Sequence, residues 1–135
     1  MLKVEHIGIA VKSLAESEAV FSKLLGQQSY KVEKVESEGV KTSFFKIGDT
    51  KIELLEADGD DSPIKKFIEK RGEGIHHITF EVADIYKEKE RLEALGFVVL
   101  NEPKPGADNK LICFLHPKST NEVLVEICQE IKALK

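Results

Sequence analysis

Residues 6–11 read His-Ile-Gly-Ile-Ala-Val, and residues 77–82 repeat the pattern as His-Ile-Thr-Phe-Glu-Val. A lone glutamate follows each stretch inside a later apolar run: Glu53 follows the first and Glu126 the second. The chain of 135 residues therefore predicts two similar halves, each with one imidazole and one carboxylate. Four such side chains in matching positions predict one metal site with four protein ligands.

Side-chain alternation selects which histidine of each half belongs to this site. In the first strand, His6 shares a face with the small residues Gly8 and Ala10, and the isoleucines between them point the other way. In the second half His77 has the same register, whereas the adjacent His76 goes to the opposite face. The predicted metal ligands are therefore His6, Glu53, His77 and Glu126.

The first half predicts a strand, a helix and three more strands. Ser13 can cap the helix at its start, and Gly26 can end it. The predicted elements are a strand at 2–11, a helix at 14–25, and strands at 29–35, 41–47 and 51–55.

The second half predicts the same order. Between the halves, an N-cap and a first-turn proline at 61–64 predict a linker helix. The predicted elements of the second half are a strand at 75–82, a helix at 84–95, and strands at 97–100, 111–116 and 123–128, with a loop at 101–109.

These patterns predict an α+β fold in which two βαβββ modules pair into a curved mixed sheet around the metal site. The whole chain, 1–135, is expected to be one domain. Module one covers about 1–58, the linker helix about 61–72, and module two about 74–130.

The residues around the two glutamates support metal binding. Each lies between two apolar neighbours, where an uncompensated charge would be costly, and a shared divalent cation would offset that cost. Imidazole and carboxylate ligands suit cobalt, zinc, nickel, manganese or ferrous iron, and the lack of thiolate ligands argues against a closed structural zinc site. Cys113 and Cys128 lie in apolar strand patterns and are expected to be buried, reduced thiols, with Cys128 on the face of Glu126.

The composition of the chain limits the classes of molecule that it is expected to bind. The net charge is −4 and the basic residues are scattered, so we expect no nucleic acid partner. No signal-peptide pattern or membrane span is visible, and we expect a cytoplasmic protein that does not bind membranes. A small-molecule substrate is the predicted partner.

The chain resembles the vicinal oxygen chelate superfamily over almost its whole length. The resemblance lies in the segments HIGIAV, KIELLE, HHITFEV and FLHPKSTNEVLVEI. Within it, the stretches 61–64 (DSPI), 74–78 (GIHHI) and 114–119 (FLHPKS) resemble the methylmalonyl-CoA epimerases. The resemblance implies paired βαβββ modules around a metal held by His, Glu or Gln, His and Glu. It also implies an acyl-CoA substrate and a homodimer.

The resemblance implies metal-dependent epimerisation at C2 of methylmalonyl-CoA through an enediolate, with an acid–base group on each side of C2. Glu126 matches one of these groups as well as the last metal ligand. Where characterised bacterial epimerases often have the second glutamate, this chain has Thr42, which is no general base at neutral pH. Glu36, Glu38 or a metal-bound water could replace it, and spacing does not choose among them.

Three other functions compete with the epimerase prediction. A glyoxalase I would bind the carboxylates of glutathione with arginines. The chain has only Arg71 and Arg91, which disfavours this function. A ring-cleaving dioxygenase uses two histidines and one carboxylate, so Glu53 would crowd its open face. A binding protein needs a cavity but no metal, and it predicts that Glu53→Gln or Glu126→Gln leaves ligand affinity nearly intact, whereas an enzyme would lose metal and turnover.

The presence of some further side chains has a structural explanation as well as a functional one. The lysines near the linker helix could meet coenzyme A phosphates, but a solvated lysine face explains them better. His116 and Lys118, which lie beside a turn, could bind substrate, and His116 could instead be a structural hydrogen bonder. These side chains are Lys65, Lys66, Lys70, His116 and Lys118.

Overall fold

The computed structural model describes residues 1–131. The chain divides into two compact units. The first unit consists of residues 6–76 and contains most of module one with the linker helix. The second unit consists of residues 1–5 and 77–131 in the described chain, so it joins module two to the first five residues.

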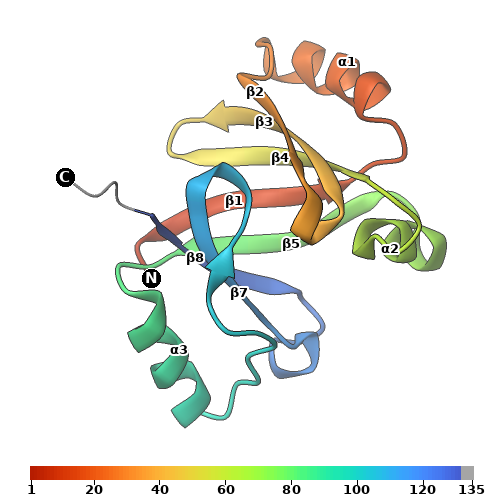
Figure 1. Cartoon of the computed structure of the whole chain (residues 1–135). Coiled ribbons are helices and arrows are strands. Elements are labelled where there is room, and N and C mark those ends of the chain that lie inside the picture. Colours follow the sequence, from red (N-terminus) through yellow and green to blue (C-terminus); the bar gives the residue numbers. More distant parts are fainter. Residues whose placement is uncertain (132–135) are drawn as a thin grey trace. The chain divides into compact units, whose positions relative to one another are not determined.

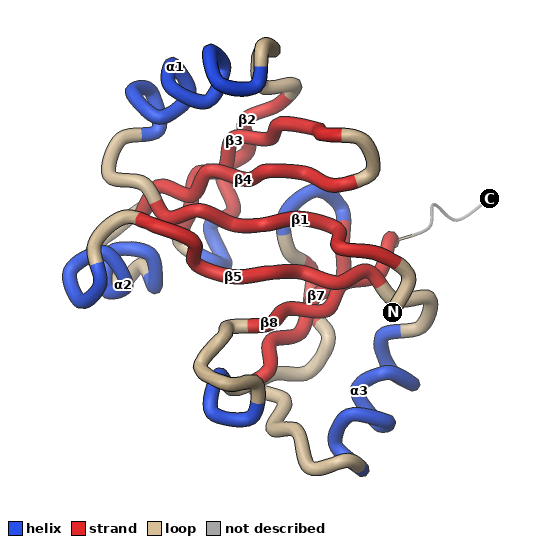
Figure 2. Tube along the Cα trace, turned by 180° about the vertical axis from the view of Figure 1, so that it is seen from behind, coloured by secondary structure: helices blue, strands red, loops and turns tan. Residues whose placement is uncertain are grey.

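The first unit is a four-stranded sheet with two helices (Figure 1). Its strand order is β2-β3-β4-β1; β1 runs parallel to β4, and the other neighbours are antiparallel. Figure 2 shows β3, β4 and β1 side by side. The elements are β1 (Lys3–Ala10, in this unit from His6 on), α1 (Leu14–Leu25), β2 (Lys31–Val35), η1 (Glu36–Glu38), β3 (Val40–Ile47), β4 (Thr50–Ala57) and α2 (Pro63–Arg71).

Helix α1 begins and ends where its capping residues predict. The Ser13 side chain accepts a hydrogen bond from the Glu16 backbone N–H, and Gly26 takes a left-handed conformation with φ 68° at the C-cap. The helix packs on the sheet face that carries Phe45 and Leu54, both fully buried. The opposite face of this sheet is therefore available for the histidine and glutamate of module one.

The second unit has the same strand pattern. Its strand order is β5-β8-β7-β6; β5 runs parallel to β8, and the other neighbours are antiparallel. The Leu2 N–H donates to the Glu81 carbonyl oxygen at 2.8 Å, which ties the start of the chain to β5. The elements are β5 (Gly74–Glu81, in this unit from His77 on), α3 (Ile85–Ala94), β6 (Lys104–Pro105), η2 (Ala107–Asn109), β7 (Lys110–Leu115), η3 (Pro117–Ser119) and β8 (Val125–Glu130).

The predicted α+β class and the βαβββ order of both halves are confirmed. The linker helix is also confirmed as α2, whose N-cap Ser62 accepts a hydrogen bond from the Ile64 N–H and whose first residue is Pro63. Helix α3 packs over its own sheet through Ile85 and Leu92, both in the buried core of the second unit. Each module therefore has one helix-covered face and one other face.

The strand predicted at 97–100 is wrong. Only a single bridge, between Val99 and Leu115, forms there, and the short strand β6 lies instead inside the predicted loop at 101–109. Side-chain hydrogen bonds explain the difference. Backbone pairing is limited to the Leu100 N–H with the Phe114 carbonyl and the His116 N–H with the Val98 carbonyl. Beyond Leu100 the Asn101 side chain takes its place: the Phe114 N–H donates to Asn101 Oδ1 at 2.9 Å, and Asn101 Nδ2 donates to the Ile112 carbonyl at 3.2 Å.

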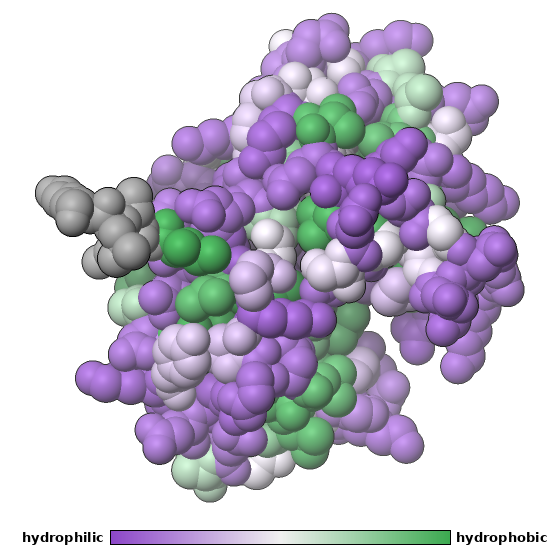
Figure 3. Space-filling view, viewed as in Figure 1, coloured by the Kyte–Doolittle hydropathy of each residue, from purple (hydrophilic) through white to green (hydrophobic). Residues whose placement is uncertain are grey.

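Within the described residues, no helix combines the length and the apolar character needed to cross a bilayer. The face drawn in Figure 3 is mainly hydrophilic, with smaller hydrophobic groups between the polar residues. This agrees with a chain in which 33% of the residues are charged.

Candidate metal centre

Module one brings His6 and Glu53 together. Strands β1 and β4 lie in parallel register with Gly8 opposite Glu53, which puts His6 and Glu53 on one face of the sheet. His6 Nδ1 lies 3.0 Å from Glu53 Oε2. Both residues are buried, at 7% and 3% exposure. The face that carries them is called here the ligand face of module one.

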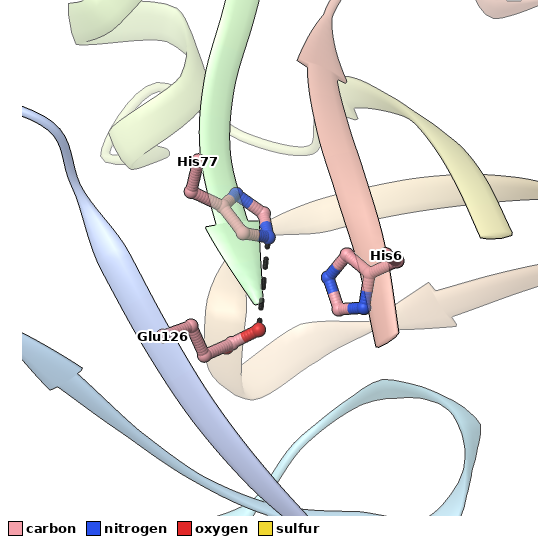
Figure 4. Close-up of side chains that lie close together, drawn as sticks. All are labelled: His6, His77 and Glu126. Atoms are coloured by element: carbon pink, nitrogen blue, oxygen red, sulfur yellow. Dashed lines mark ion pairs between the residues drawn. The ribbon is translucent and has the colours of Figure 1, made fainter. Parts of the chain in front are cut away.

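Module two brings His77 and Glu126 together on the corresponding strands, β5 and β8. His77 Nε2 lies 3.6 Å from Glu126 Oε1, the contact drawn as a dashed line in Figure 4. Both residues are buried. The Thr79 hydroxyl donates to Glu126 Oε1 at 2.6 Å, and the Phe114 ring stands edge-on to the His77 ring at 6.0 Å. In module two, the Glu126 carboxylate therefore contacts both the Thr79 hydroxyl and the His77 imidazole.

The donor chemistry of these pairs fits a divalent metal ion. A carboxylate buried beside an imidazole is costly unless hydrogen bonds or positive charge compensate it, and a bound cation would supply that charge. Imidazole nitrogen and carboxylate oxygen are ligands for zinc and its neighbours in the first transition row. Each module thus contains half of the predicted ligand set, and binding of one ion by all four residues stays a prediction.

His76 has a separate structural role, as alternation predicts. Its ring packs edge-on against Phe67 of α2, with the ring centroids 4.9 Å apart. Burial lowers the pKa of His76 to about 4, so the side chain is neutral at physiological pH. Of the two adjacent histidines, only His77 lies with a glutamate of the predicted site.

Thr42 lies on the ligand face of module one. In β3 it is two residues from Phe44, which stands directly opposite Glu53. Thr42 is fully buried, and its hydroxyl has no hydrogen-bond partner among the described residues. Leaving a buried hydroxyl without a partner costs about 1–3 kcal/mol. The next residue, Ser43, points to the α1 side.

The structure distinguishes the glutamates that could assist at Thr42. The Glu36 side chain is 83% exposed and lies 3.8 Å from Lys34 Nζ, so it faces solvent. Glu38 has one buried carboxylate oxygen. Glu33, which the sequence analysis missed, stands directly opposite Thr42 on β2, on the same face. Pairing the predicted strands at 29–35 and 41–47 across their turn could have found it.

The remaining candidates have ordinary structural environments. Lys65 pairs with Asp60 at 3.0 Å on the surface, and this pair raises the pKa of Lys65. His116 Nδ1 accepts a hydrogen bond from the Lys118 N–H at 3.1 Å and caps η3, so it is a structural hydrogen bonder. Arg71 lies over the Phe67 ring.

The two cysteines are free and buried, as expected. Burial raises the pKa of Cys113 to about 11 and raises that of Cys128 as well. Cys128 lies opposite Ile112 and Glu81 in the sheet, on the face of Glu126. Its raised pKa leaves it an inert buried thiol rather than a nucleophile.

Comparison with known proteins agrees with this architecture. The family model described as Glyoxalase/Bleomycin resistance protein/Dioxygenase superfamily matches residues 5–114. The ethylmalonyl-CoA/methylmalonyl-CoA epimerase of Cereibacter sphaeroides is 42% identical over 130 residues, covering 94% of this chain and 97% of the relative. The mitochondrial methylmalonyl-CoA epimerase of Dictyostelium discoideum is 44% identical over 128 residues, covering 93% of this chain and 76% of the relative.

Solved structures agree with the sequence relatives. A single-residue variant of the Streptomyces coelicolor methylmalonyl-CoA epimerase, in complex with 2-nitronate-propionyl-CoA, matches with a TM-score of 0.94 and 32% identity, covering 100% of this chain and 99% of that one. The residue pairs, the repeated modules and these matches lead to one conclusion. The chain belongs to the Glyoxalase/Bleomycin resistance protein/Dioxygenase superfamily and, within it, to the methylmalonyl-CoA epimerase family of isomerases.

Proposed function

We propose that this chain is a metal-dependent methylmalonyl-CoA epimerase. One observation carries the proposal: each module buries a histidine against a glutamate at the same place in its sheet. The named relatives, which act on acyl-CoA thioesters according to their names, supply the substrate class. A buried, duplicated donor pair is more than packing requires, because two apolar residues would fill the same space without the cost of desolvation.

We propose that His6, Glu53, His77 and Glu126 together bind one divalent ion, with cobalt, zinc, nickel and manganese as candidates. Bound there, the ion would supply positive charge for the thioester carbonyl oxygen and the carboxylate of the substrate. The support for this ligand set is the donor chemistry of the two pairs and the family to which the chain belongs. In each pair a ring nitrogen and a carboxylate oxygen lie 3.0 or 3.6 Å apart, close enough for both to reach one ion.

Glu126 is the proposed acid–base group on one side of C2. Removal of the C2 proton leaves an enediolate, whose negative charge spreads onto the thioester oxygen. The Thr79 hydroxyl holds Glu126 Oε1 at 2.6 Å and limits rotation of that carboxylate. Inversion also requires a second group on the opposite side of C2, because return of the proton to the same side regenerates the starting epimer.

The test is exchange of the C2 proton in deuterated buffer. The protein is stripped of metal with a chelator, reconstituted with cobalt, and incubated with methylmalonyl-CoA while NMR follows deuterium incorporation and inversion at C2. We expect both to require the metal. Absence of exchange from metal-loaded protein would overturn the epimerase proposal, and turnover of the hemithioacetal of glutathione and methylglyoxal would replace it with glyoxalase I. Metal-independent ligand binding without turnover would instead indicate a binding protein.

A homodimer is a further proposal, supported by the family resemblance. Sedimentation equilibrium tests it directly, since the monomer mass of 15.1 kDa would double.

A further inference from the structure

Lys31 places a positive charge on the ligand face of module one. It is the cross-strand partner of Phe44. Phe44 is in turn the partner of Glu53, so the three side chains form one row across β2, β3 and β4 and share one face of the sheet. Lys31 Nζ lies 4.9 Å from the centre of the Phe44 ring, as expected for a side chain on this face. The Lys31 side chain is 37% exposed, so a ligand can reach it.

Two contacts within module one position the ammonium group of Lys31. The Phe44 ring attracts it through a cation–π contact. Glu33, two residues further along β2, places Oε1 3.2 Å from Lys31 Nζ, and its own side chain is one-third exposed. Because both contacts come from β2 and β3, the ammonium group is positioned before any ligand binds.

The internal repeat shows that the fold does not need a charge at this position. The N–H of the preceding residue donates to the Phe44 carbonyl at 2.9 Å in module one and to the Phe114 carbonyl at 2.8 Å in module two. Lys31 and Asn101 therefore occupy equivalent positions. The neutral Asn101 side chain forms hydrogen bonds with the backbone of β7, so a cation at this place is particular to module one.

The proposed substrate brings a charge that the proposed metal ligands do not balance. Glu53 and Glu126 would together neutralise one divalent ion, and the free carboxylate of methylmalonyl-CoA adds a further negative charge. A charge held away from water is costly unless an opposite charge compensates it. An ammonium group beside the bound acyl group would provide that compensation.

Strand spacing places Lys31 within reach of a group bound beside Glu53. Neighbouring strands lie about 4.8 Å apart, so the backbones of these two residues are separated by about 10 Å. The lysine side chain spans part of this distance, because Nζ lies over Phe44 on the intervening strand. The phosphates of coenzyme A lie at the far end of the pantetheine arm, so a group this close to Glu53 is suited to the acyl end of the substrate.

We propose that Lys31 is a specificity-determining residue that binds the free carboxylate of the acyl group, an inference that rests on the proposed function. The carboxylate lies over the ligand face of module one and accepts a charge-assisted hydrogen bond from the ammonium group. Lys31 thereby distinguishes a thioester with a second carboxylate from one that lacks it.

The test compares Lys31→Met with Lys34→Met. Methionine keeps an unbranched side chain over Phe44 and removes the charge. Lys34 is the matched control, because it lies on the same strand but on the opposite face, where it pairs with Asp58 at 3.5 Å. Cobalt-loaded protein is titrated in a calorimeter with an equilibrium mixture of the methylmalonyl-CoA epimers and, separately, with propionyl-CoA, which lacks the carboxylate.

For Lys31→Met we expect the affinity for methylmalonyl-CoA to fall about 10-fold, because one charge-assisted hydrogen bond is lost. The affinity for propionyl-CoA should not change. Lys34→Met should bind both thioesters as wild type does, and Lys31→Arg, which keeps the charge, should recover most of the loss. Lys31→Gln repeats the test with a polar replacement.

Unchanged affinity for methylmalonyl-CoA in Lys31→Met and Lys31→Gln would overturn the proposal. An equal loss of affinity for both thioesters would also overturn it, because Lys31 would then bind the phosphates that the two ligands share. Failure of the epimerase proposal has a different signature. Wild-type protein that prefers methylmalonyl-CoA to propionyl-CoA through Lys31 but does not invert C2 would contradict the epimerase proposal and leave this inference intact.

Discussion

The two modules carry the same histidine–glutamate pair but hold the glutamate differently. In module one, Glu53 contacts His6 Nδ1 at 3.0 Å, and Gly8 offers no side chain at the adjacent position. In module two, Glu126 lies 3.6 Å from His77 Nε2 and accepts a 2.6 Å hydrogen bond from the residue that replaces Gly8, Thr79. Two halves of a repeat can therefore share a histidine–glutamate pair while the residue beside the glutamate differs, Gly8 in module one and Thr79 in module two.

The largest expected difference between the modules comes from Glu126→Gln and Glu53→Gln. If the proposed function holds, both amides weaken metal binding, and Glu126→Gln also removes the proposed acid–base group. We expect Glu126→Gln to reduce C2 exchange about 1,000-fold and Glu53→Gln to reduce it about 10- to 100-fold. Initial rates at saturating cobalt, with metal content measured on the same samples, test this order. Equal losses would mean that the two carboxylates have the same role.

The adjacent histidines of β5 provide a matched pair for metal binding. We expect His77→Ala to lower cobalt affinity by about 10-fold or more. His76→Ala should leave metal binding unchanged and cost about 1 kcal/mol of unfolding free energy, because it removes the ring contact with Phe67. Isothermal titration with cobalt and urea unfolding of both variants measure the two effects. A loss of cobalt affinity in His76→Ala would contradict the assignment.

Thr79→Val tests the feature that sets module two apart. The variant removes the hydroxyl that holds Glu126 and keeps the shape of the side chain. We expect turnover to fall about 10-fold to 100-fold, in the range seen for groups that orient metal ligands. Thr79→Ser is the control, since it restores the hydroxyl. If the valine variant turns over as fast as wild type, the hydrogen bond does not orient Glu126 for catalysis.

The last prediction concerns stability in alkaline solution and the cysteines, which occur only in module two. The pKa of Cys113 rises from 9.0 to about 11 on burial. The folded thiol stays neutral where the unfolded thiol ionises, so the full stability present below pH 9 is lost progressively as pH rises from 9 to 11. The loss amounts to about 2–3 kcal/mol. Amide exchange should rise first in β7 and β8. Cys113→Ser should remove the part of the alkaline decline that comes from Cys113 and leave the part that comes from Cys128, whose pKa is also raised by burial. A uniform rise over both modules would refute this origin.

Much of the fold could be predicted from local signals. Ser13 and Gly26 set the limits of α1, and Ser62 and Pro63 set the start of α2, because caps satisfy backbone groups within a few residues. The strand predicted at 97–100 failed for the opposite reason. There the Asn101 side chain accepts from the Phe114 N–H and donates to the Ile112 carbonyl, both on β7 and more than ten positions away, and no local pattern reveals such a contact.

The sequence by itself determined the repeat, the helix limits and the four candidate ligands, since alternation along a strand decides which side chains share a face. Tertiary structure alone decided which side chains meet across strands. Strand register put Thr79 on Glu126 and Glu33 opposite Thr42. Packing of Phe67 from α2 against His76 leaves that ring half-buried, and this burial lowers its pKa. Register and burial depend on pairing between segments far apart in the chain. A local sequence pattern therefore cannot predict which partners a residue has.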